Sequence, residues 1–333
     1  MTNTTLPPRS PMDYIELSNL DLSDFDNPES RKKLARQFYD AVTQEGFVTG
    51  IYVGFKTAGG LGFHKESDTH SLKIDFYNML YQDSKADRKH PPHLIPYLDE
   101  IRKVMLHIRE NIQKKLFILL AMCLEMPVDE LMATHAPGQS SSEYYRYMSY
   151  APLTPEATAK ARGLFMPAHA DWGTFSILFS QPVSALQILH KSNVFIWVEY
   201  KPYTLIVNVG QALELLTGGL FPATIHRVVT PPKDQVDCLR VGIYYFSRPN
   251  DDFPLAPLHN SPVLKRLGRN KPLDLDVTYS TVEFLEAKKH GYLKPDLDFD
   301  KPKDKDLQDD PFRQGDRFAA TEKVLASITK VSA

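Results

Sequence analysis

The sequence predicts an α+β fold in which a double-stranded β-helix (jelly roll) follows an N-terminal helical cap with a long supporting helix. Three observations predict it. One apolar stripe at helical spacing runs through Ile95–Leu119, seven short β-type runs lie between Glu143 and Arg248, and the end of the chain is rich in charge and proline. We therefore expect residues 1–135 to form a mainly helical region, residues 136–250 the jelly-roll domain, and residues 251–333 a C-terminal extension.

The N-terminal region carries two helical patterns with a strand between them. In the first pattern, apolar residues recur at helical spacing after Asn27 or Ser30, either of which is suitable as an N-cap: Leu34, Phe38, Ala41 and Val42. Phe47–Val53 has the composition of a strand. The second pattern steps by three and four residues, as expected of the buried face of one long helix: Ile95, Leu98, Ile101, Met105, Ile108, Ile112, Leu116 and Leu119. We expect the basic residues between these positions, including Arg109, to face solvent.

The jelly-roll region consists of short runs separated by Pro, Gly and Asn. The predicted strands are Tyr144–Tyr150, Thr174–Phe179, Leu186–Leu189, Val194–Tyr200, Thr204–Val209, Thr224–Thr230 and Cys238–Phe246. Gln211–Leu216 predicts a helical turn within this region. Further along, Val282–His290 predicts a helix, Asp296–Asp310 is too charged to pack a core, and Asp316–Lys330 predicts a surface helix.

Composition narrows the possible partners. The chain has 333 residues, a formal net charge of −2 and two cysteines, Cys123 and Cys238. This charge gives no reason to expect binding to nucleic acid or to an anionic membrane. Met1–Pro11 lacks the apolar segment of a signal peptide, and two cysteines form no disulfide framework, so we expect a cytoplasmic protein.

A possible metal site begins at His169. Residues two apart in a strand point to the same side, so His169 and Asp171 can reach one ion. On its own this pair is weak evidence, because composition gives roughly one His-x-Asp by chance. His226 lies in a later strand-like run, Thr224–Val229. Two histidines and one carboxylate leave the opposite face of a metal open, as non-haem Fe(II) oxygenases require. The helical His-Glu-x-x-His of many zinc hydrolases is absent from the sequence.

A second candidate group lies on the run Arg240–Phe246. Because side chains alternate between the two faces of a strand, one face carries Arg240, Gly242, Tyr244 and Phe246. An arginine that faces the interior of a sandwich requires an anion, and its planar fork suits a carboxylate. A dicarboxylate that binds iron at one end and Arg240 at the other would satisfy it. Two alternatives stay open: a pairing of Arg240 with a protein carboxylate, or exposure to solvent.

These residues carry a resemblance over roughly residues 14–249. The chain resembles the isopenicillin-N-synthase-like branch of the Fe(II)/2-oxoglutarate-dependent dioxygenase superfamily, most strongly in His169–Gly173, in Trp197 followed by Leu205–Gly210, and in Leu216–Gly219 leading to His226–Val229. The resemblance implies that His169, Asp171 and His226 bind iron, and that Arg240 and Tyr150 bind 2-oxoglutarate. It implies Fe(II), 2-oxoglutarate and O₂ as cofactor and co-substrates.

The sequence departs from the family pattern at two positions near the implied 2-oxoglutarate site. Gly242 replaces the serine of the usual Arg-x-Ser motif, so one hydrogen bond to the distal carboxylate is lost unless another group supplies it. Met148 stands where many members have an asparagine. The resemblance therefore leaves open an Fe(II) oxidase that does not use 2-oxoglutarate, in which Arg240 meets a substrate carboxylate.

The implied activity is oxidation of a small molecule by hydroxylation, desaturation or rearrangement. The resemblance to fungal and plant enzymes indicates a natural-product substrate from secondary metabolism. Candidate substrate contacts are Phe165, Trp172, Tyr244 and Phe246, each of which is also suited to the core. A non-catalytic jelly-roll binding protein is a further alternative, although such a protein has no need of all three metal ligands. The sequence does not indicate an oligomeric state.

Overall fold

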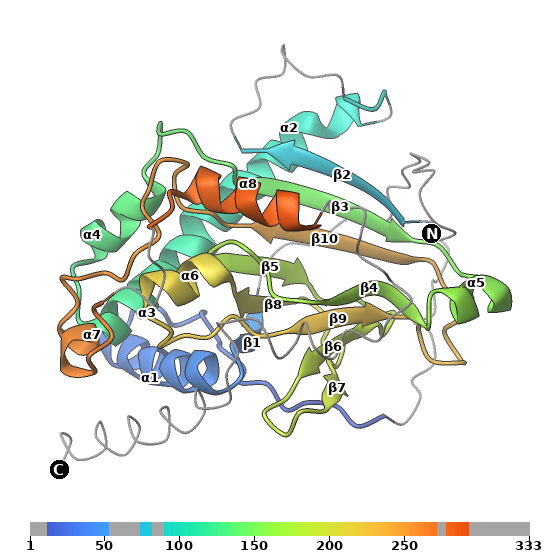
Figure 1. Cartoon of the computed structure of the whole chain (residues 1–333), viewed down its shortest axis with the longest axis horizontal. Coiled ribbons are helices and arrows are strands. Elements are labelled where there is room, and N and C mark those ends of the chain that lie inside the picture. Colours follow the sequence, from blue (N-terminus) through green and yellow to red (C-terminus); the bar gives the residue numbers. More distant parts are fainter. Residues whose placement is uncertain (1–11, 53–73, 82–89, 93, 272–277, 293–333) are drawn as a thin grey trace.

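Two antiparallel sheets form the centre of the protein. The computed structural model describes residues 12–52, 74–81, 90–92, 94–271 and 278–292. The larger sheet has the strand order β1 (Phe47–Tyr52), β8 (Thr204–Val209), β5 (Phe175–Phe179), β10 (Arg240–Phe246), β3 (Tyr144–Tyr150) and β2 (Ile74–Leu80) (Figure 1). The smaller sheet has the strand order β4 (Leu164–His169), β9 (His226–Val229), β6 (Leu186–Leu189) and β7 (Phe195–Trp197).

The two sheets face one another as the jelly-roll prediction requires. The ring of Phe47 on β1 meets that of His226 on β9 with centroids 5.7 Å apart, and the ring of Tyr150 on β3 meets that of Phe165 on β4 at 5.3 Å. Each of these pairs joins a strand of the larger sheet to a strand of the smaller one. The even-numbered residues of β3 and β10 therefore point into the space between the sheets, which places Tyr150 and Arg240 inside.

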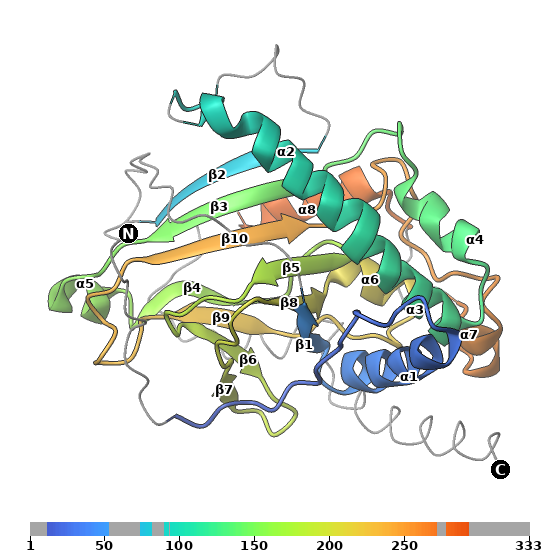
Figure 2. The same ribbon diagram turned by 180° about the vertical axis from the view of Figure 1, so that it is seen from behind.

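One long helix supports the outer face of the larger sheet, as predicted. It consists of α2 (Leu98–His107), a π-helical segment (Ile108–Gln113) and α3 (Lys114–Leu124), and it crosses the sheet diagonally (Figure 2). Helix α1 (Pro28–Gln44) lies beside α3, and Asn27 caps it by accepting hydrogen bonds from the backbone N–H groups of Glu29 and Ser30. Of the two candidate N-caps, Asn27 and Ser30, the N-cap is therefore Asn27.

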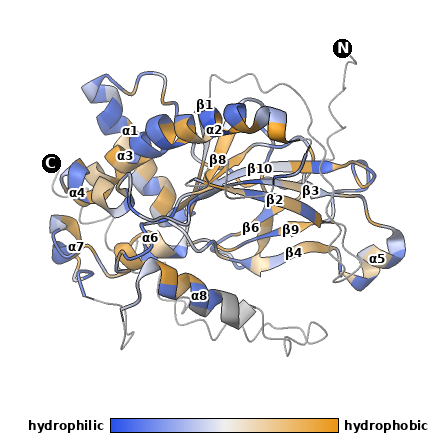
Figure 3. Cartoon of the chain, turned by 90° about the horizontal axis from the view of Figure 1, so that it is seen from above, coloured by the Kyte–Doolittle hydropathy of each residue, from blue (hydrophilic) through white to orange (hydrophobic). Residues whose placement is uncertain are grey.

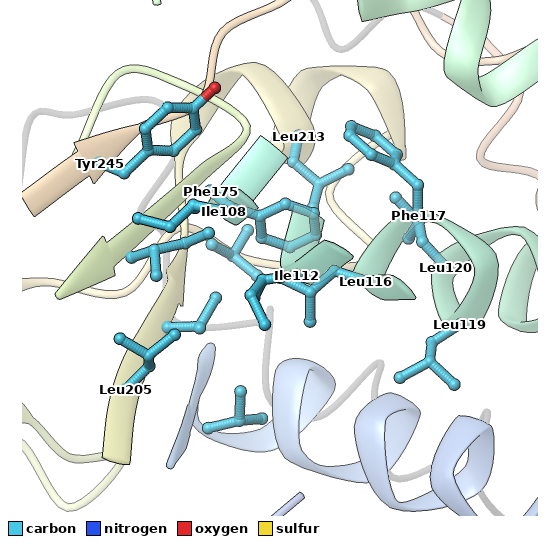
Figure 4. Close-up of a cluster of buried hydrophobic side chains, with 14 of the residues drawn as sticks. Ile108, Ile112, Leu116, Phe117, Leu119, Leu120, Phe175, Leu205, Leu213 and Tyr245 are labelled. Atoms are coloured by element: carbon cyan, nitrogen blue, oxygen red, sulfur yellow. The ribbon is translucent and has the colours of Figure 1, made fainter. Parts of the chain in front are cut away.

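The main hydrophobic core lies between this helix and the sheet. Ile108, Ile112 and Leu116 of the helical stripe are at most 5% exposed, and they pack towards Phe175, Leu205 and Tyr245 of the sheet (Figure 4). Odd-numbered residues of β5 and β10 supply this outer face because strand side chains alternate. Truncating Leu116 to alanine would cost about 2–5 kcal/mol.

The remaining helices are short, apart from α8: α4 (Val128–Met132), α5 (Pro155–Lys160), α6 (Gln211–Leu216), α7 (Pro262–Arg266) and α8 (Thr281–Tyr292). Seen from above, α1, α2 and α3 lie on one side of the sheets and α8 lies on the other (Figure 3). The helices expected at Gln211–Leu216 and near Val282–His290 are both present. None of the helices in the described ranges has the length and apolar character that crossing a bilayer requires.

The structure differs from the sequence expectations in three places. Strand β4 ends at His169, so Asp171 lies beyond the strand that was expected to contain both residues. Strand β2 lies in a region that was expected to be mainly helical, and it pairs with the whole length of β3. Arg109 does not face solvent: it forms an ion pair with the fully buried Glu143, and its guanidinium lies 4.2 Å from the centroid of the Tyr81 ring. The segments 296–310 and 316–330 lie outside the described residues.

Candidate functional site

Three side chains, two on the smaller sheet and one just beyond β4, meet at one point. His169 ends β4, Asp171 follows it, and His226 begins β9, where it pairs directly with His169 across the two strands. One ligand atom from each residue lies within 4.8 Å of the others. The structure therefore brings together the three residues that the sequence singled out, at separations suited to binding a single metal ion.

Both histidines have the same orientation, with Nδ1 at a backbone carbonyl oxygen and Nε2 towards Asp171. Nδ1 of His169 lies 2.9 Å from the carbonyl oxygen of Pro167, and Nδ1 of His226 lies 3.2 Å from that of Thr224. A carbonyl oxygen can only accept a hydrogen bond, so each Nδ1 carries a proton, and in the neutral imidazole each Nε2 keeps a lone pair. Nε2 of His169 lies 3.6 Å from Oδ1 of Asp171, and Nε2 of His226 lies 3.7 Å from Oδ2. This arrangement of two free nitrogens around a carboxylate fits a divalent metal ion.

Asp171 is held by the larger sheet. The side-chain amide of Asn208 on β8 donates a hydrogen bond of 2.8 Å to Oδ2 of Asp171. Burial raises the pKa of Asp171, but the nearby His226 and His169 outweigh burial, and the pKa lies well below its ordinary value. Burial, opposed by Asp171, lowers the pKa of His226 to about 4. Asp171 is thus an anion and His226 a neutral imidazole at neutral pH, the forms that bind metal.

A second group of residues lies around Arg240, which is 2% exposed. Its guanidinium lies 5.0 Å from the centroid of the Tyr150 ring, and its Nη1 donates to the hydroxyl of Tyr244 at 3.3 Å. Among the described residues no carboxylate pairs with it, and its Nε has no hydrogen-bond partner. The Tyr150 hydroxyl donates to the sulfur of Met148 at 3.4 Å. Of the alternatives for Arg240, exposure to solvent is excluded.

The four residues expected to contact substrate lie in two different places. Tyr244 and Phe246 stack with ring centroids 5.9 Å apart on the face that carries Arg240, and Phe165 packs against Tyr150. Trp172 instead packs against the cluster of apolar residues around α6 and α8. The structure therefore places Phe165 and Tyr244 beside the Arg240 site, Phe246 next to Tyr244 at the other end of β10, and Trp172 elsewhere.

Three polar residues around the triad were not anticipated: Asn208, Arg146 and Arg248. Arg146 shares the inner face of β3 with Tyr150, and Arg248 follows β10. Alternation from Tyr150 would have placed Arg146 on the inner face. The sequence pattern does not predict the direction of the Arg248 side chain, because Arg248 lies beyond the end of β10.

A family model for the 2OG-Fe(II) oxygenase superfamily matches residues 143–249, the segment that holds the triad and Arg240. The matched segment runs from the start of β3 to just beyond the end of β10, so it includes the whole smaller sheet and four strands of the larger one.

Proteins similar to this chain occur in fungi and plants. The chain is 30% identical over 205 residues to a 2-oxoglutarate-dependent dioxygenase of Aspergillus fumigatus, covering 55% of this chain and 52% of the relative. It is 27% identical over 190 residues to jasmonate-induced oxygenase 3 of Arabidopsis thaliana, covering 55% and 49%. The chain thus matches about half the length of these curated relatives.

Solved structures share the fold. A full-length Neurospora crassa protein in complex with alpha-KG and thymine superimposes with a TM-score of 0.66, at 14% sequence identity, covering 83% of this chain and 97% of that chain. A putative 2OG-Fe(II) oxygenase family protein of Caulobacter crescentus superimposes with a TM-score of 0.64, at 18% identity, covering 83% and 99%. At these levels of identity the likeness establishes the jelly-roll fold and leaves activity to be argued from the site.

Proposed function

We propose that this protein is an Fe(II)- and 2-oxoglutarate-dependent oxygenase of the isopenicillin-N-synthase-like branch, which oxidises a small organic molecule. The observation that carries the proposal is the pairing of two sites between the same sheets. His169, Asp171 and His226 would hold Fe(II), and Arg240 is a buried cation with no carboxylate partner among the described residues. Fe(II) and 2-oxoglutarate, when bound, supply the oxidising chemistry, which proteins cannot supply with side chains alone.

Arg240 supports 2-oxoglutarate as the co-substrate. Removing a guanidinium from water is costly unless an anion compensates for its charge, and the described residues supply none within ion-pair distance. The distal carboxylate of 2-oxoglutarate would supply that anion. Tyr150, whose ring lies beside the guanidinium, would turn its hydroxyl from Met148 towards the carboxylate.

Tyr244 compensates for the departure at Gly242. A Cβ atom at residue 242 would lie 2.6 Å from the hydroxyl oxygen and 2.7 Å from Cζ of Tyr244, so the tyrosine ring fills the space that a serine side chain would occupy. Its hydroxyl accepts a hydrogen bond from Arg240. We propose that the Tyr244 hydroxyl takes the role of the missing serine on the distal carboxylate, which makes Tyr244 a co-substrate contact.

The substrate is proposed to be a small molecule, which the stacked aromatic rings of Tyr144, Tyr244 and Phe246 between the sheets would accommodate. The narrower proposal, a natural-product intermediate, rests on the resemblance to fungal and plant oxygenases. The outcome of oxidation depends on which carbon the substrate presents to the metal.

The test is an anaerobic titration of Fe(II)-loaded protein with 2-oxoglutarate, followed by the weak visible charge-transfer band of the chelate. We expect a saturable band in the wild type. In Arg240→Gln the half-saturating concentration should rise by roughly 10- to 100-fold, because hydrogen bonds to a charged group are lost. Arg227→Gln is the matched control, since Arg227 lies on β9 with its guanidinium over the Phe195 ring.

Two outcomes would contradict the proposal. Bound iron without a band would favour the Fe(II) oxidase that uses no 2-oxoglutarate. Failure of the purified protein to bind Fe(II) or Co(II) would favour the non-catalytic binding protein.

A further inference from the structure

Two arginines lie at the triad end of the inner face, away from Arg240. Arg146 on β3 pairs with Tyr244 on β10, and Tyr150 pairs with Arg240. Arg146 and Tyr150 are four residues apart, so their Cα atoms are separated by about 13 Å along the strand. Arg248 lies against the loop that carries the metal-site aspartate: a Cβ atom at Gly173 would lie 3.3 Å from its Cγ. The two arginines therefore form a positive region distinct from the Arg240 site.

Arg146 is held by aromatic rings and one amide. Its Nε donates to Oδ1 of Asn78 at 2.7 Å, and its guanidinium lies 4.9 Å from the centroid of Phe76, 5.0 Å from that of Tyr144 and 5.3 Å from that of Phe246. Rings of this kind fix the plane of a guanidinium and leave its outer N–H groups free to donate. Among the described residues, no carboxylate lies within ion-pair distance of Arg146.

Arg248 lies beside the same tyrosine. Its guanidinium is 4.7 Å from the Tyr144 centroid, and its Nη1 donates to the carbonyl oxygen of Ser142 at 3.3 Å. Its Nε is buried without a hydrogen-bond partner among the described residues. Tyr144 is thus flanked by two guanidinium groups, and neither has a carboxylate partner in the described part of the chain. Asp171 and Asp251 act on Arg248 electrostatically without forming an ion pair with it, so the repulsion between the two cations is only partly compensated.

The charge of the whole inner face supports an anionic ligand. Arg146, Arg240 and Arg248 lie on or next to the inner face of the larger sheet, and the carboxylates of Asp171 and Asp251 both act on Arg248. Three cations thus outnumber these two carboxylates. If Fe(II) and the 2-oxoglutarate dianion bind as proposed above, their charges cancel, and the positive excess persists next to the metal. This step rests on the proposed function.

We propose that Arg146 and Arg248 form a subsite for the carboxylate of the substrate, which is therefore a small organic acid. Two planar forks suit the two oxygens of a carboxylate. The stacked rings of Tyr144 and Phe246, whose centroids are 4.7 Å apart, would support the apolar body of the acid beside it. The subsite orients the substrate by its charged end and leaves its carbon framework towards the triad.

The experiment measures binding to the anaerobic Fe(II)- and 2-oxoglutarate-loaded protein by calorimetry. The probes are small aromatic and aliphatic monocarboxylates, each compared with its neutral methyl ester. We expect acids to bind the wild type at least roughly tenfold more tightly than their esters, and this preference to disappear in Arg146→Gln and in Arg248→Gln. Arg227→Gln should keep the preference.

The 2-oxoglutarate titration on the same variants separates this proposal from the proposed function. Arg146→Gln and Arg248→Gln should keep the charge-transfer band of the wild type, whereas Arg240→Gln should weaken it. A wild type that binds no acid in the series, or binds acid and ester equally, overturns the subsite, as does an unchanged preference in both variants. An absent band in the wild type overturns the proposed function instead.

Discussion

Gly242 and Tyr244 depend on each other. Residues 242 and 244 share the inner face of β10, and the Tyr244 ring lies over the glycine, where any larger side chain would collide with it. The glycine is required because it leaves room for the ring, and the ring is required because it carries the hydroxyl that Arg240 contacts. Neither residue can be changed to the family pattern alone.

This dependence gives a prediction for single and double variants. Tyr244→Phe should weaken 2-oxoglutarate binding by roughly fivefold, the value of one hydrogen bond of about 1 kcal/mol. Gly242→Ser should weaken it as well, because the new side chain displaces the ring. The double variant Gly242→Ser/Tyr244→Ala removes the ring that would collide with the new serine and supplies a serine hydroxyl, so it should bind more tightly than Gly242→Ser alone. Titration of the charge-transfer band measures all four proteins. Equal affinities for Tyr244→Phe and the wild type would contradict the role of this hydroxyl.

Alternation explains why the sequence could indicate Arg240 and His169, whereas Tyr150 was indicated only by the resemblance to the family and His226 by its strand-like run. Each of these residues lies in or next to a short strand whose burial is expected from its composition, so its side is predictable. The bending of the Tyr244 side chain back over Gly242 could not be predicted, because it depends on a side-chain rotamer and on the absence of a Cβ atom two residues away. Arg248 and Trp172 lie outside strands, where alternation gives no direction.

At the scale of the secondary-structure elements, the π-helical segment determines where the long helix places its polar residues. A π-helical turn adds a residue to the helix and rotates the later turns about the helix axis. Ile108 and Ile112 keep facing the sheet, while Arg109 and Gln113 both reach Glu143, to whose carboxylate Gln113 donates at 3.2 Å. A basic residue on a helix is usually solvated. The buried partner of Arg109 is Glu143, which lies in a loop, so the helical pattern gives no sign of this contact. The expectation for Arg109 was wrong for this reason.

We expect this buried pair to be sensitive to the loss of one partner. Glu143→Gln should lower the free energy of unfolding by about 3–5 kcal/mol, because Arg109 is then a buried charge without an anion. The double variant Arg109→Met/Glu143→Gln should recover part of that loss. Urea denaturation measures both, with Lys103→Met, an exposed change on the same helix, as the control. A loss below about 1 kcal/mol in Glu143→Gln would show that the pair is not coupled to folding.

At the scale of the whole molecule, the sequence predicted the layers but not every strand. The jelly-roll strands were predictable because Pro, Gly and Asn bound each short run. Strand β2 was not, because Phe76 and Leu80 on its inner face are exposed at the sheet edge and its partner β3 lies far along the chain. Pairing between distant segments depends on tertiary structure rather than on local pattern.

The stability of the folded protein should depend on pH through His135. This side chain is 1% exposed and lies 3.0 Å from the Thr174 hydroxyl, and burial, together with the positive charge of Arg109, lowers its pKa well below 6.5. As pH falls below 6.5 the unfolded chain takes up a proton that the folded protein excludes. Stability from His135 is thus fully present above pH 6.5 and is lost below it, by about 1.4 kcal/mol per pH unit.

A comparison with His135→Gln isolates this effect. The difference in free energy of unfolding between the wild type and the variant should shrink by about 1 kcal/mol between pH 6.5 and 5.5, because the unfolded chain is already half protonated at pH 6.5. Urea denaturation at pH 7.5, 6.5 and 5.5 measures it. A difference that is the same at all three values would mean that His135 is protonated in the folded protein or makes no pH-dependent contribution.

The position of Trp172 has a practical consequence. The chain has two tryptophans, and this one directly follows Asp171 and packs against α6 and α8, whereas Trp197 lies on β7 at the edge of the smaller sheet. Paramagnetic ions quench indole emission at short range. In a Trp197→Phe protein, all remaining emission would come from one fluorophore adjacent to the metal site, so each Fe(II) or Co(II) that binds there would dim the protein in proportion to occupancy.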